Sequence, residues 1–582
     1  MPIQSRRRFL TNAAFARAAG LSGFSWGKAL AAMSTKILII TISTVFLGTT
    51  VTMARSVTAT GPTADTVIDA SGFNQFQSFV KSIAPKNLDA AGVQTFTDGV
   101  TDYIYGYSLL AIAMTERVAT TVAEVTSTRA PINQLVIGDA LPDPAFQYVV
   151  LPSTTTLYAS SFMDLSSGPL VLHMPRLPPV VGTMRPRFFI VELLDAWTNV
   201  SRESPSSRLG SQPGDYLLIG PGGTTASTAD YAGVIIFDSN TVWSILRFFT
   251  DGSDADIKAL DAALVNETNP ADSLSLRPLG TGTDYKPPSN LPVNPSIDTF
   301  TQPIEQVDNM DACAFFETMS TMMMTNPPRK VDVLVEKPLQ RLGLLTPETP
   351  FSCVGLADQN EVIILQAAVV AAKGLLANIN PPSATAATNY WSVPLNVGDY
   401  GINYLLRALV AKKALGANRP QDAVYGYGAF DSRGINTANL LDGANRYVVH
   451  FSPETNLHRT GEIPPVNPGS PSSPGGFWSV TLYDANGFLV QNVNMPPNAS
   501  YNAIGMPYVQ NHKACPNADG SLDLYIQSDR PTDPTQFCNW LETPLPNGSN
   551  ATTSQFILFL RVYWPDRAVL DGRWNPPAIV KR

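Results

Sequence analysis

Charged residues are scarce in this sequence. Aspartate, glutamate, lysine and arginine make up only 15% of the 582 residues, whereas about 25% is usual. No cluster of lysine and arginine follows the N-terminal segment, and the net charge is -8. A nucleic-acid-binding protein needs a basic surface that neutralises phosphates, so this composition argues against that class. A surface rich in Ser, Thr, Asn, Gln and Pro is instead typical of a β-rich exported protein.

The motifs of common catalytic and metal centres are also missing. Neither an HExxH pair nor a GxSxG nucleophile elbow occurs. Gly220 to Gly223 follows a predicted strand, but no helix beginning with Lys-Ser or Lys-Thr comes next, so we predict a tight turn and not a phosphate loop. We expect neither a metal nor a cofactor. His450, within a strand pattern, is predicted to be a hydrogen-bonded structural residue; the four histidines are scattered at His173, His450, His458 and His512.

The N-terminal apolar run is too short for a comfortable transmembrane helix, which needs about 20 residues. Ser5 to Leu10 fits a twin-arginine export signal, and Met33 begins a second unit with an apolar run over 37–48. Translation that starts at Met33 would leave an ordinary secretory signal. Alternatively, the first segment is a true twin-arginine signal and the second is retained as an anchor. Both alternatives predict a protein that is secreted, periplasmic or displayed on the cell surface.

The sequence contains four cysteines and no CxxC motif, which argues against a zinc site. In an oxidising compartment we expect two disulfides that pair Cys313 with Cys353 and Cys515 with Cys538, with four buried free thiols as the alternative. N-glycosylation sequons matter only if the host glycosylates; they occur at Asn199, Asn266, Asn498, Asn547 and Asn550.

The hydrophobic periodicity changes from helical to strand-like twice along the chain. Short strands separated by turn residues suggest β-sandwiches. We therefore predict an α+β, multidomain protein, whose oligomeric state the sequence leaves open. Its predicted segments are an export signal region at 1–54, a disordered lead-in at 55–75, a helix plus β-sandwich domain at 76–295, a helical middle region at 296–420 and a C-terminal domain at 421–582.

The stretch from Gly476 to Asn492 has the alternation of a β-hairpin. Trp478, Val480 and Leu482 alternate with polar or mixed residues, so we expect these three to face a core. An Asp-Ala-Asn-Gly turn and a return strand should follow. Tyr483 lies on the opposite face and is the hairpin residue for which we predict a functional role.

Lone charges within apolar patterns are further candidates. Arg407 follows Tyr404 by one helical turn, and Arg561 is a lone charge in an apolar strand. Each arginine could bind a ligand carboxylate or bridge to an aspartate of the protein. Asp195 lies in an apolar segment and must be paired or protonated, while Glu192 falls on the opposite strand face. The predicted ligand-binding residues are Tyr404, Arg407, Asp431 and Tyr483.

Several motifs occur in the order of a known family pair. YIYGY, LYASSFMDLSSGPLVLHMP, ELLDAWTNV and GDYLLIGPG resemble the domain of unknown function 1254, and GFWSVTLYDANGFLVQN, ADGSLDLYIQ and LRVYWPDRAVLDGRWNPP resemble the domain of unknown function 1214. The resemblance implies an N-terminal immunoglobulin-like β-sandwich, a helical middle region and a C-terminal jelly-roll-like β-sandwich. It implies no activity. Where relatives usually show Asn-x-Asp-Thr, this chain has Ser153 to Thr156, so any function of that Asn and Asp would be missing here.

Two classes of function remain open. The first is an exported enzyme that acts on a polar small molecule or glycan, in a cleft between the helical middle and the C-terminal sandwich. The second is a non-catalytic ligand-binding or envelope-associated structural protein. Missing motifs favour the second class, whereas lone polar residues in apolar strands favour the first, which we prefer slightly.

Overall fold

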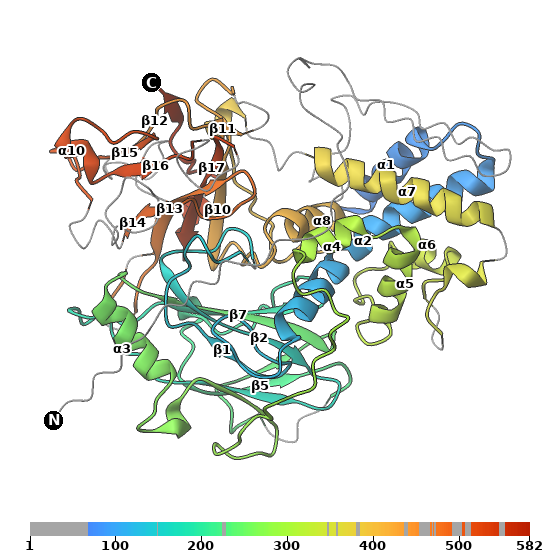
Figure 1. Cartoon of the computed structure of the whole chain (residues 1–582), viewed down its shortest axis with the longest axis horizontal. Coiled ribbons are helices and arrows are strands. Elements are labelled where there is room, and N and C mark those ends of the chain that lie inside the picture. The colour runs from blue at the N-terminus through green and yellow to red at the C-terminus, as the bar shows by residue number, and fades with distance from the viewer. Residues whose placement is uncertain are drawn as a thin grey trace, which may run out of the picture. The chain divides into compact units, whose positions relative to one another are not determined.

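The structure is a computed structural model (Figure 1). It describes residues 68–147, 149–223, 228–345, 349–356, 359–379, 385–435, 440–452, 466–467, 469–470, 473–491, 503–506, 514–545 and 553–582. The predicted export region and most of the predicted lead-in lie outside these residues. Helix α1 begins at Ala70, within the segment predicted as lead-in. All described residues belong to the unit Val57–Arg582.

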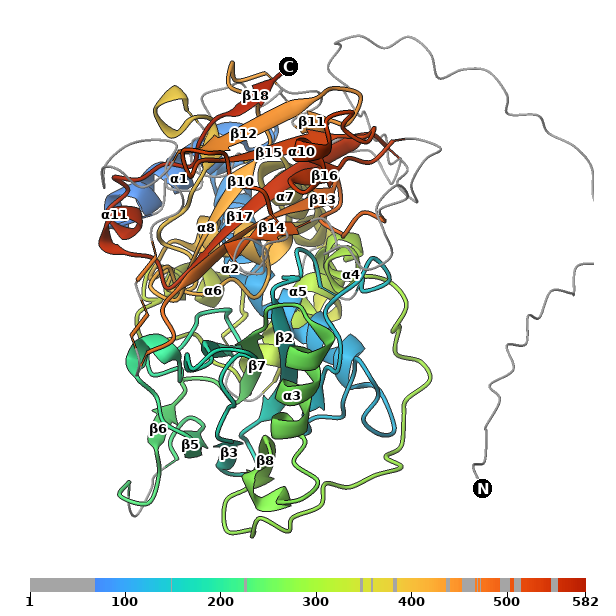
Figure 2. The ribbon, with the colours of Figure 1, turned by 90° about the vertical axis from the view of Figure 1, so that its left-hand side faces the viewer.

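Helix α2 lies at the centre of a helical cluster (Figures 1 and 2). Two glycines let its neighbours approach: a Cβ at Gly99 would lie 2.8 Å from the Cβ of Ala368 on α7, and a Cβ at Gly106 would overlap Met319 on α5. The helical part predicted for the segment 76–295 consists of most of α1 and all of α2. The cluster comprises α1 (Ala70–Ile83), α2 (Ala90–Thr120), α4 (Pro303–Asn309), α5 (Ala312–Met323), α6 (Glu336–Arg341), α7 (Gln359–Asn378) and α8 (Tyr404–Lys413).

Among the described helices, α7 alone is long and apolar enough to cross a membrane, over Asn360–Asn378. Leu365, Ala368 and Leu376 of α7 are nevertheless buried in the helical cluster. The core helix of a globular domain has the same length and composition, so α7 is weak evidence for a membrane span. The apolar run at 37–48 lies outside the described residues.

The first β region consists of two four-stranded sheets that share one core. Leu157, Val191 and Leu246 face this core, whereas Tyr158, Trp243 and neighbouring alternate residues point to the other side of their sheet. Helix α3 (Asp254–Leu264) adds Leu260 and Leu264 to the core. The strand order of one sheet is β1 (Val136–Ile137), β2 (Thr156–Asp164), β7 (Thr241–Phe249), β4 (Phe189–Asp195). The strand order of the other sheet is β6 (Gly233–Ile236), β5 (Gly214–Ile219), β3 (Leu170–Met174), β8 (Ser275–Pro278).

The second β region also joins two sheets through a shared core (Figure 2). One sheet has the order β14 (Ala503–Gly505), β13 (Phe477–Asp484), β17 (Gln555–Tyr563), β10 (Ala423–Gly428), β9 (Trp391–Ser392), with β11 (Leu441–Asp442) also paired to β17. The other has the order β16 (Trp540–Glu542), β15 (Leu522–Gln527), β12 (Tyr447–Phe451), β18 (Ile579–Lys581). The predicted mixed α+β class is therefore confirmed.

The hairpin prediction is correct for the core face, and the returning chain pairs with β13 in two separate places. Trp478, Val480 and Leu482 are all buried in the core of the second β region, as predicted. After the turn, Leu489 forms an isolated antiparallel bridge with Tyr483, and the chain pairs with the same edge of β13 again at β14. The other edge of β13 is paired along its whole length with β17.

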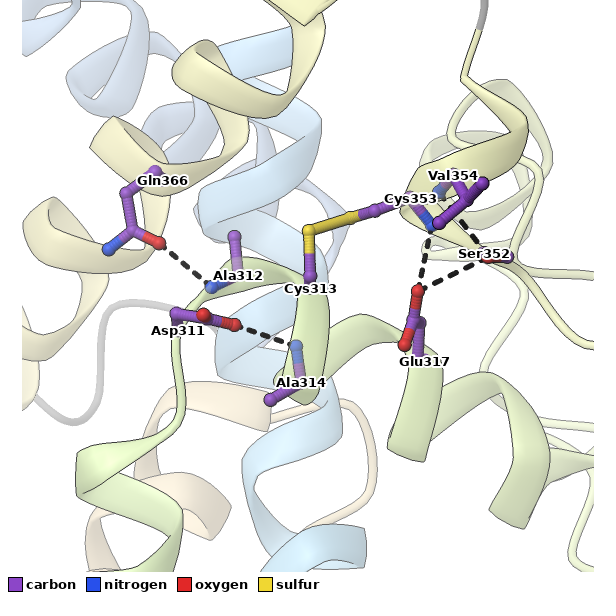
Figure 3. The surroundings of a disulfide bond; sticks show 9 residues. All are labelled: Asp311, Ala312, Cys313, Ala314, Glu317, Ser352, Cys353, Val354 and Gln366. Atoms are coloured by element: carbon purple, nitrogen blue, oxygen red, sulfur yellow. Dashed lines mark hydrogen bonds between the residues drawn. A yellow bond between two sulfur atoms is a disulfide. The ribbon is translucent and has the colours of Figure 1, made fainter.

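Both predicted cysteine pairs lie at disulfide distance, with S–S separations of 2.08 Å for Cys313–Cys353 and 2.10 Å for Cys515–Cys538. Figure 3 shows the first disulfide joining α5 to the 3-10 turn Cys353–Gly355, where Glu317 accepts a hydrogen bond from the Cys353 backbone N–H at 2.9 Å. Such bonds persist in oxidising compartments.

Candidate functional site

A cavity of about 780 Å³ lies where the helical cluster and both β regions meet. Its walls come from the C-terminal end of α2, from α8, from the segment 127–152 and from two sheet faces. The first sheet face is that of β2 and β7, and the second is that of β10 and β17. Most of the wall is apolar, including Val118, Leu141, Val149, Leu151, Ile245, Leu406, Leu409, Val410 and Phe559.

Arg561 on β17 is the most enclosed cation of this wall, with 3% of its surface exposed. Its Nη2 donates to the Leu151 backbone oxygen at 2.5 Å, and its Nη1 lies 3.5 Å from Thr481 Oγ1. The guanidinium carbon is 4.6 Å from the ring centroid of Phe559 and 5.6 Å from that of Tyr483. Two roles are predicted for Arg561: binding a ligand carboxylate, or bridging to an aspartate of the protein. Arg561 forms no bridge with an aspartate among the described residues.

Arg247 on β7 is the second buried arginine of the wall, and its charge is neutralised by a glutamate that does not line the cavity. It forms an ion pair with Glu192 of β4, which is fully buried, and its Nη2 donates to the Gly416 backbone oxygen at 3.0 Å. Burial raises the pKa of Glu192, and the Arg247 charge opposes that shift. Glu192 and Asp195 lie on opposite faces of β4, as predicted.

Tyrosines and one lysine add further polar groups to the wall. The Tyr158 hydroxyl accepts a hydrogen bond from the Ser153 backbone N–H at 2.8 Å, and the Tyr425 hydroxyl accepts from the Asn418 side-chain amide at 2.8 Å. Lys413 of α8 also lines the cavity and forms no ion pair with a described carboxylate. Burial lowers the pKa of Lys413, and the neighbouring charge of Lys412 lowers it further.

Arg407 and Tyr404, predicted as ligand contacts, lie together but outside the cavity wall. The Arg407 guanidinium is fully buried, 4.9 Å from the ring centroid of Tyr105, 5.2 Å from that of Tyr404 and 5.4 Å from that of Trp197. Its Nη1 is 3.9 Å from Asp332 Oδ2. Arg407 therefore links α2, α8 and the turn after β4 as a structural bridge.

Asp431 and Tyr483 occupy two further places, so the four predicted residues do not converge. Asp431 is paired with Arg433 at 2.7 Å. Burial raises the pKa of Asp431, but hydrogen bonds from Arg433 and Ile435 outweigh this effect and leave the pKa below its usual value. Tyr483 is fully buried and donates a hydrogen bond to the Pro152 backbone oxygen at 2.5 Å. It lies behind Arg561 and does not line the cavity itself.

The remaining candidates have structural partners. Asp195 is held by Asn199, whose backbone N–H donates to Oδ1 at 2.8 Å and whose amide donates to Oδ2 at 3.0 Å. The buried Asn199 amide is thus engaged, which disfavours a glycan at this sequon in the folded protein. His450 is hydrogen-bonded to Asp523 at 2.7 Å, as predicted. Gly220 to Gly223 forms the predicted turn, closed by a hydrogen bond from Gly223 N–H to Gly220 O at 3.1 Å.

Several predicted features have no structural account here. His458, His512 and the sequons at Asn498, Asn547 and Asn550 lie outside the described residues. In the part of the chain that the structure describes, no three His, Cys, Asp or Glu side chains are grouped so as to hold a metal ion.

The segment Ser153 to Thr156, where the family resemblance predicts Asn-x-Asp-Thr, lies beside the cavity. Ser153 Oγ is 3.0 Å from Thr155 Oγ1, and the preceding residues Leu151 and Pro152 belong to the cavity wall. The sequence motif marked Ser153 to Thr156 as unusual. It could not show that this segment lies near Arg561, which is about 400 residues away in the chain.

Glu116 near the end of α2 provides a test of burial around the cavity. Burial, together with the neighbouring Asp164 charge, raises the pKa of Glu116 to about 7, while Arg117 opposes the shift. Because the folded pKa exceeds the unfolded one, the free energy of unfolding should fall as pH rises from about 4.3 to about 7. Glu116→Gln should flatten this decline by roughly 2–3 kcal/mol. Urea denaturation across this pH range measures the effect; identical pH profiles would show that Glu116 ionises normally.

Comparisons with known proteins agree with this architecture. Residues 132–268 match the family described as "Protein of unknown function (DUF1254)", and residues 422–567 match "Protein of unknown function (DUF1214)". No functionally curated protein is significantly similar to the chain.

Two solved structures are similar over most of the chain. The crystal structure of the VPA0106 protein from Vibrio parahaemolyticus covers 84% of this chain and 100% of its own, with 18% identity and a TM-score of 0.52, which shows a shared fold. That of an uncharacterized protein from Burkholderia cenocepacia covers 84% and 96%, with 11% identity and a TM-score of 0.33. The chain is thus similar to the DUF1254 family over 132–268 and to the DUF1214 family over 422–567, and both segments contribute residues to the cavity wall.

Proposed function

We propose that this protein is an exported binding protein that holds a small organic molecule in the cavity. The observation that carries the proposal is the cavity itself, whose volume of about 780 Å³ falls within the range of about 300–1,000 Å³ typical of ligand sites. Ligand sites combine mainly apolar walls with a few oriented polar groups, and this wall has that composition. A ligand with a large apolar part fits it better than a glycan does.

Binding without catalysis is the function that the wall supports best. The described residues of the wall include neither histidine nor cysteine, which are the commonest bases and nucleophiles. Glu192, whose pKa is raised by burial, stands behind Arg247 and is not part of the wall. An enzyme acting on a polar molecule or glycan is the alternative. The ligand roles of Tyr404, Arg407, Asp431 and Tyr483 stay predictions.

Export and the domain types form part of the proposal. Two disulfide pairs support an oxidising compartment outside the cytosol. In each β region two sheets of mostly antiparallel strands share one core. This arrangement supports an immunoglobulin-like first region and a jelly-roll-like second region. The domain limits 76–295, 296–420 and 421–582 belong to the same proposal.

A cavity-filling variant tests the binding function. Val410 lines the cavity from α8 and has 8% of its surface exposed, so Val410→Trp should fill part of the ligand space. We expect the wild-type protein to bind Nile red, a neutral dye that fluoresces in apolar surroundings, and Val410→Trp to bind it at least about tenfold more weakly. Fluorescence titration measures both dissociation constants.

The matched control is the same substitution outside the cavity. Val370 on α7 is 37% exposed and does not line the cavity, so Val370→Trp should bind the dye like the wild type. If the wild-type protein does not bind the dye saturably, the binding proposal fails. It also fails if a folded Val410→Trp variant retains full affinity.

A further inference from the structure

The cavity wall carries an excess of unpaired positive charge. Its cations are Arg129, Arg247, Lys413 and Arg561, and its described acids are Asp139 and Asp143. Both acids are exposed to solvent, where water screens their charge. Arg247 is neutralised by Glu192. Arg129, Lys413 and Arg561 therefore line the cavity without an ion-pair partner among the described residues, and Arg561 is the most buried of the three.

Arg561 is the cation of these three whose charge is least accessible to water. An arginine stays charged when buried, whereas a buried lysine can lose its proton, and the pKa of Lys413 is already lowered. A buried charge is strongly unfavourable unless it is paired and hydrogen-bonded. Arg561 has five N–H donors: one donates to the Leu151 backbone oxygen, one lies at the limit of hydrogen bonding, 3.5 Å from Thr481, and the guanidinium also interacts with the Tyr483 hydroxyl.

The surroundings of Arg561 compensate its charge only in part. The rings of Phe559 and Tyr483 attract the guanidinium through their faces. Ser479, directly across from Arg561 on β13, is fully buried, and its hydroxyl has no hydrogen-bond partner among the described residues. Tyr425, across from Arg561 on β10, also lines the cavity. The site thus contains a buried hydroxyl, that of Ser479, and a buried guanidinium without an ion-pair partner among the described residues.

We propose that the ligand is an apolar carboxylic acid whose carboxylate pairs with Arg561 while its apolar body lies against α8 and the end of α2. This inference rests on the proposed binding function and adds the chemical class of the ligand. A carboxylate matches the planar fork of a guanidinium with two parallel hydrogen bonds. The apolar wall formed by Val118, Leu409 and Val410 then excludes water from the rest of the molecule.

Two probes of equal chain length, decanoate and decanol, test the inference. The wild-type protein should bind decanoate at least about tenfold more tightly than decanol at neutral pH, because a hydrogen-bonded charge pair is worth more than a neutral contact. In Arg561→Met this preference should disappear, with decanol affinity retained. Arg561→Lys should keep part of the preference, since it keeps the charge but loses the fork. Competition with Nile red gives all affinities.

Two further variants separate Arg561 from its alternatives. Lys413→Met should leave most of the preference for decanoate, whereas its loss in this variant would assign the anion to Lys413 and overturn the inference. Arg567→Met serves as the control, since Arg567 is 87% exposed and lies outside the cavity wall. It should behave like the wild type.

The outcomes distinguish the two proposals. If decanol and Nile red bind while decanoate binds no better than decanol, the carboxylate inference fails and the binding function stands. If none of the three probes binds, the binding function itself fails. Retention of decanol affinity by Arg561→Met shows that the variant is folded; if Arg561→Met does not fold, the affinities of Arg561→Lys decide, and an unchanged preference there contradicts pairing through the guanidinium fork.

Discussion

Replacing Arg187 with methionine is expected to destabilise the protein by roughly 3–5 kcal/mol, because it leaves a buried carboxylate without its cation. The side chains of Arg187 and Asp256 have no exposed surface, and their nearest atoms are 2.7 Å apart. Arg187 also donates hydrogen bonds to the backbone oxygens of Pro178, Pro179 and Phe249. Asp256 lies in the first turn of α3, and Arg187 lies just before β4, so the ion pair connects α3 to the edge of the first β region.

Urea denaturation of Arg187→Met measures this effect, and two comparisons identify its cause. The double variant Arg187→Met with Asp256→Leu should recover most of the lost stability, since it removes both buried charges. Arg202→Met breaks an ion pair with Asp399 in which Arg202 is 70% exposed, so it should cost less than about 1 kcal/mol. Equal losses in Arg187→Met and Arg202→Met would contradict the buried character of the first pair.

The penalty of Arg187→Met should also depend on pH. In the wild type, burial raises the pKa of Asp256, but hydrogen bonds from Arg187 and Val181 outweigh it and leave the pKa below its usual value. This contribution is present above the unfolded pKa and is lost as pH falls through the folded one. The difference in unfolding free energy between wild type and variant should therefore shrink toward acidic pH.

Replacing Trp478 with alanine should cost roughly 3–5 kcal/mol through loss of buried surface and the cavity that remains. Trp478 is 2% exposed on β13, and its ring centroid lies 5.4 Å from that of Phe451 on β12. It thus connects the two sheets of the second β region. Chemical denaturation of Trp478→Ala checks the magnitude.

The control for Trp478→Ala is a large aromatic residue at the surface. Phe300 is 95% exposed, so Phe300→Ala should change the unfolding free energy by no more than about 0.5 kcal/mol. A loss below about 1 kcal/mol in Trp478→Ala would show that the two sheets do not share the core described above.

Local patterns predicted much of this fold. Alternation identified the buried face of β13, because the side chains of a strand point to opposite sides in turn. The same reasoning placed Glu192 and Asp195 on opposite faces of β4. The sequence did not reveal β7, although it is the central strand between β2 and β4, because every one of its residues is buried and alternation is therefore absent.

The cavity could not be predicted from the sequence. Its wall combines residues between Thr115 and Tyr563, and only tertiary packing brings them together. The pattern correctly flagged Arg407 and Arg561 as lone charges but could not say which of them has a protein partner. The structure shows Asp332 near Arg407 and no carboxylate paired with Arg561 among the described residues. That difference depends on the packing of distant segments.

Hydrogen exchange with and without decanoate tests the central claim, that a ligand occupies the space between α8 and the two sheet faces. Ligand binding slows exchange where it stabilises local structure. We predict slower exchange in α8, in β17 and in the segment around Leu151, with smaller changes in α3 and β15. Slower exchange confined to regions away from the cavity wall, or decanoate binding without any change in α8 and β17, would contradict the account.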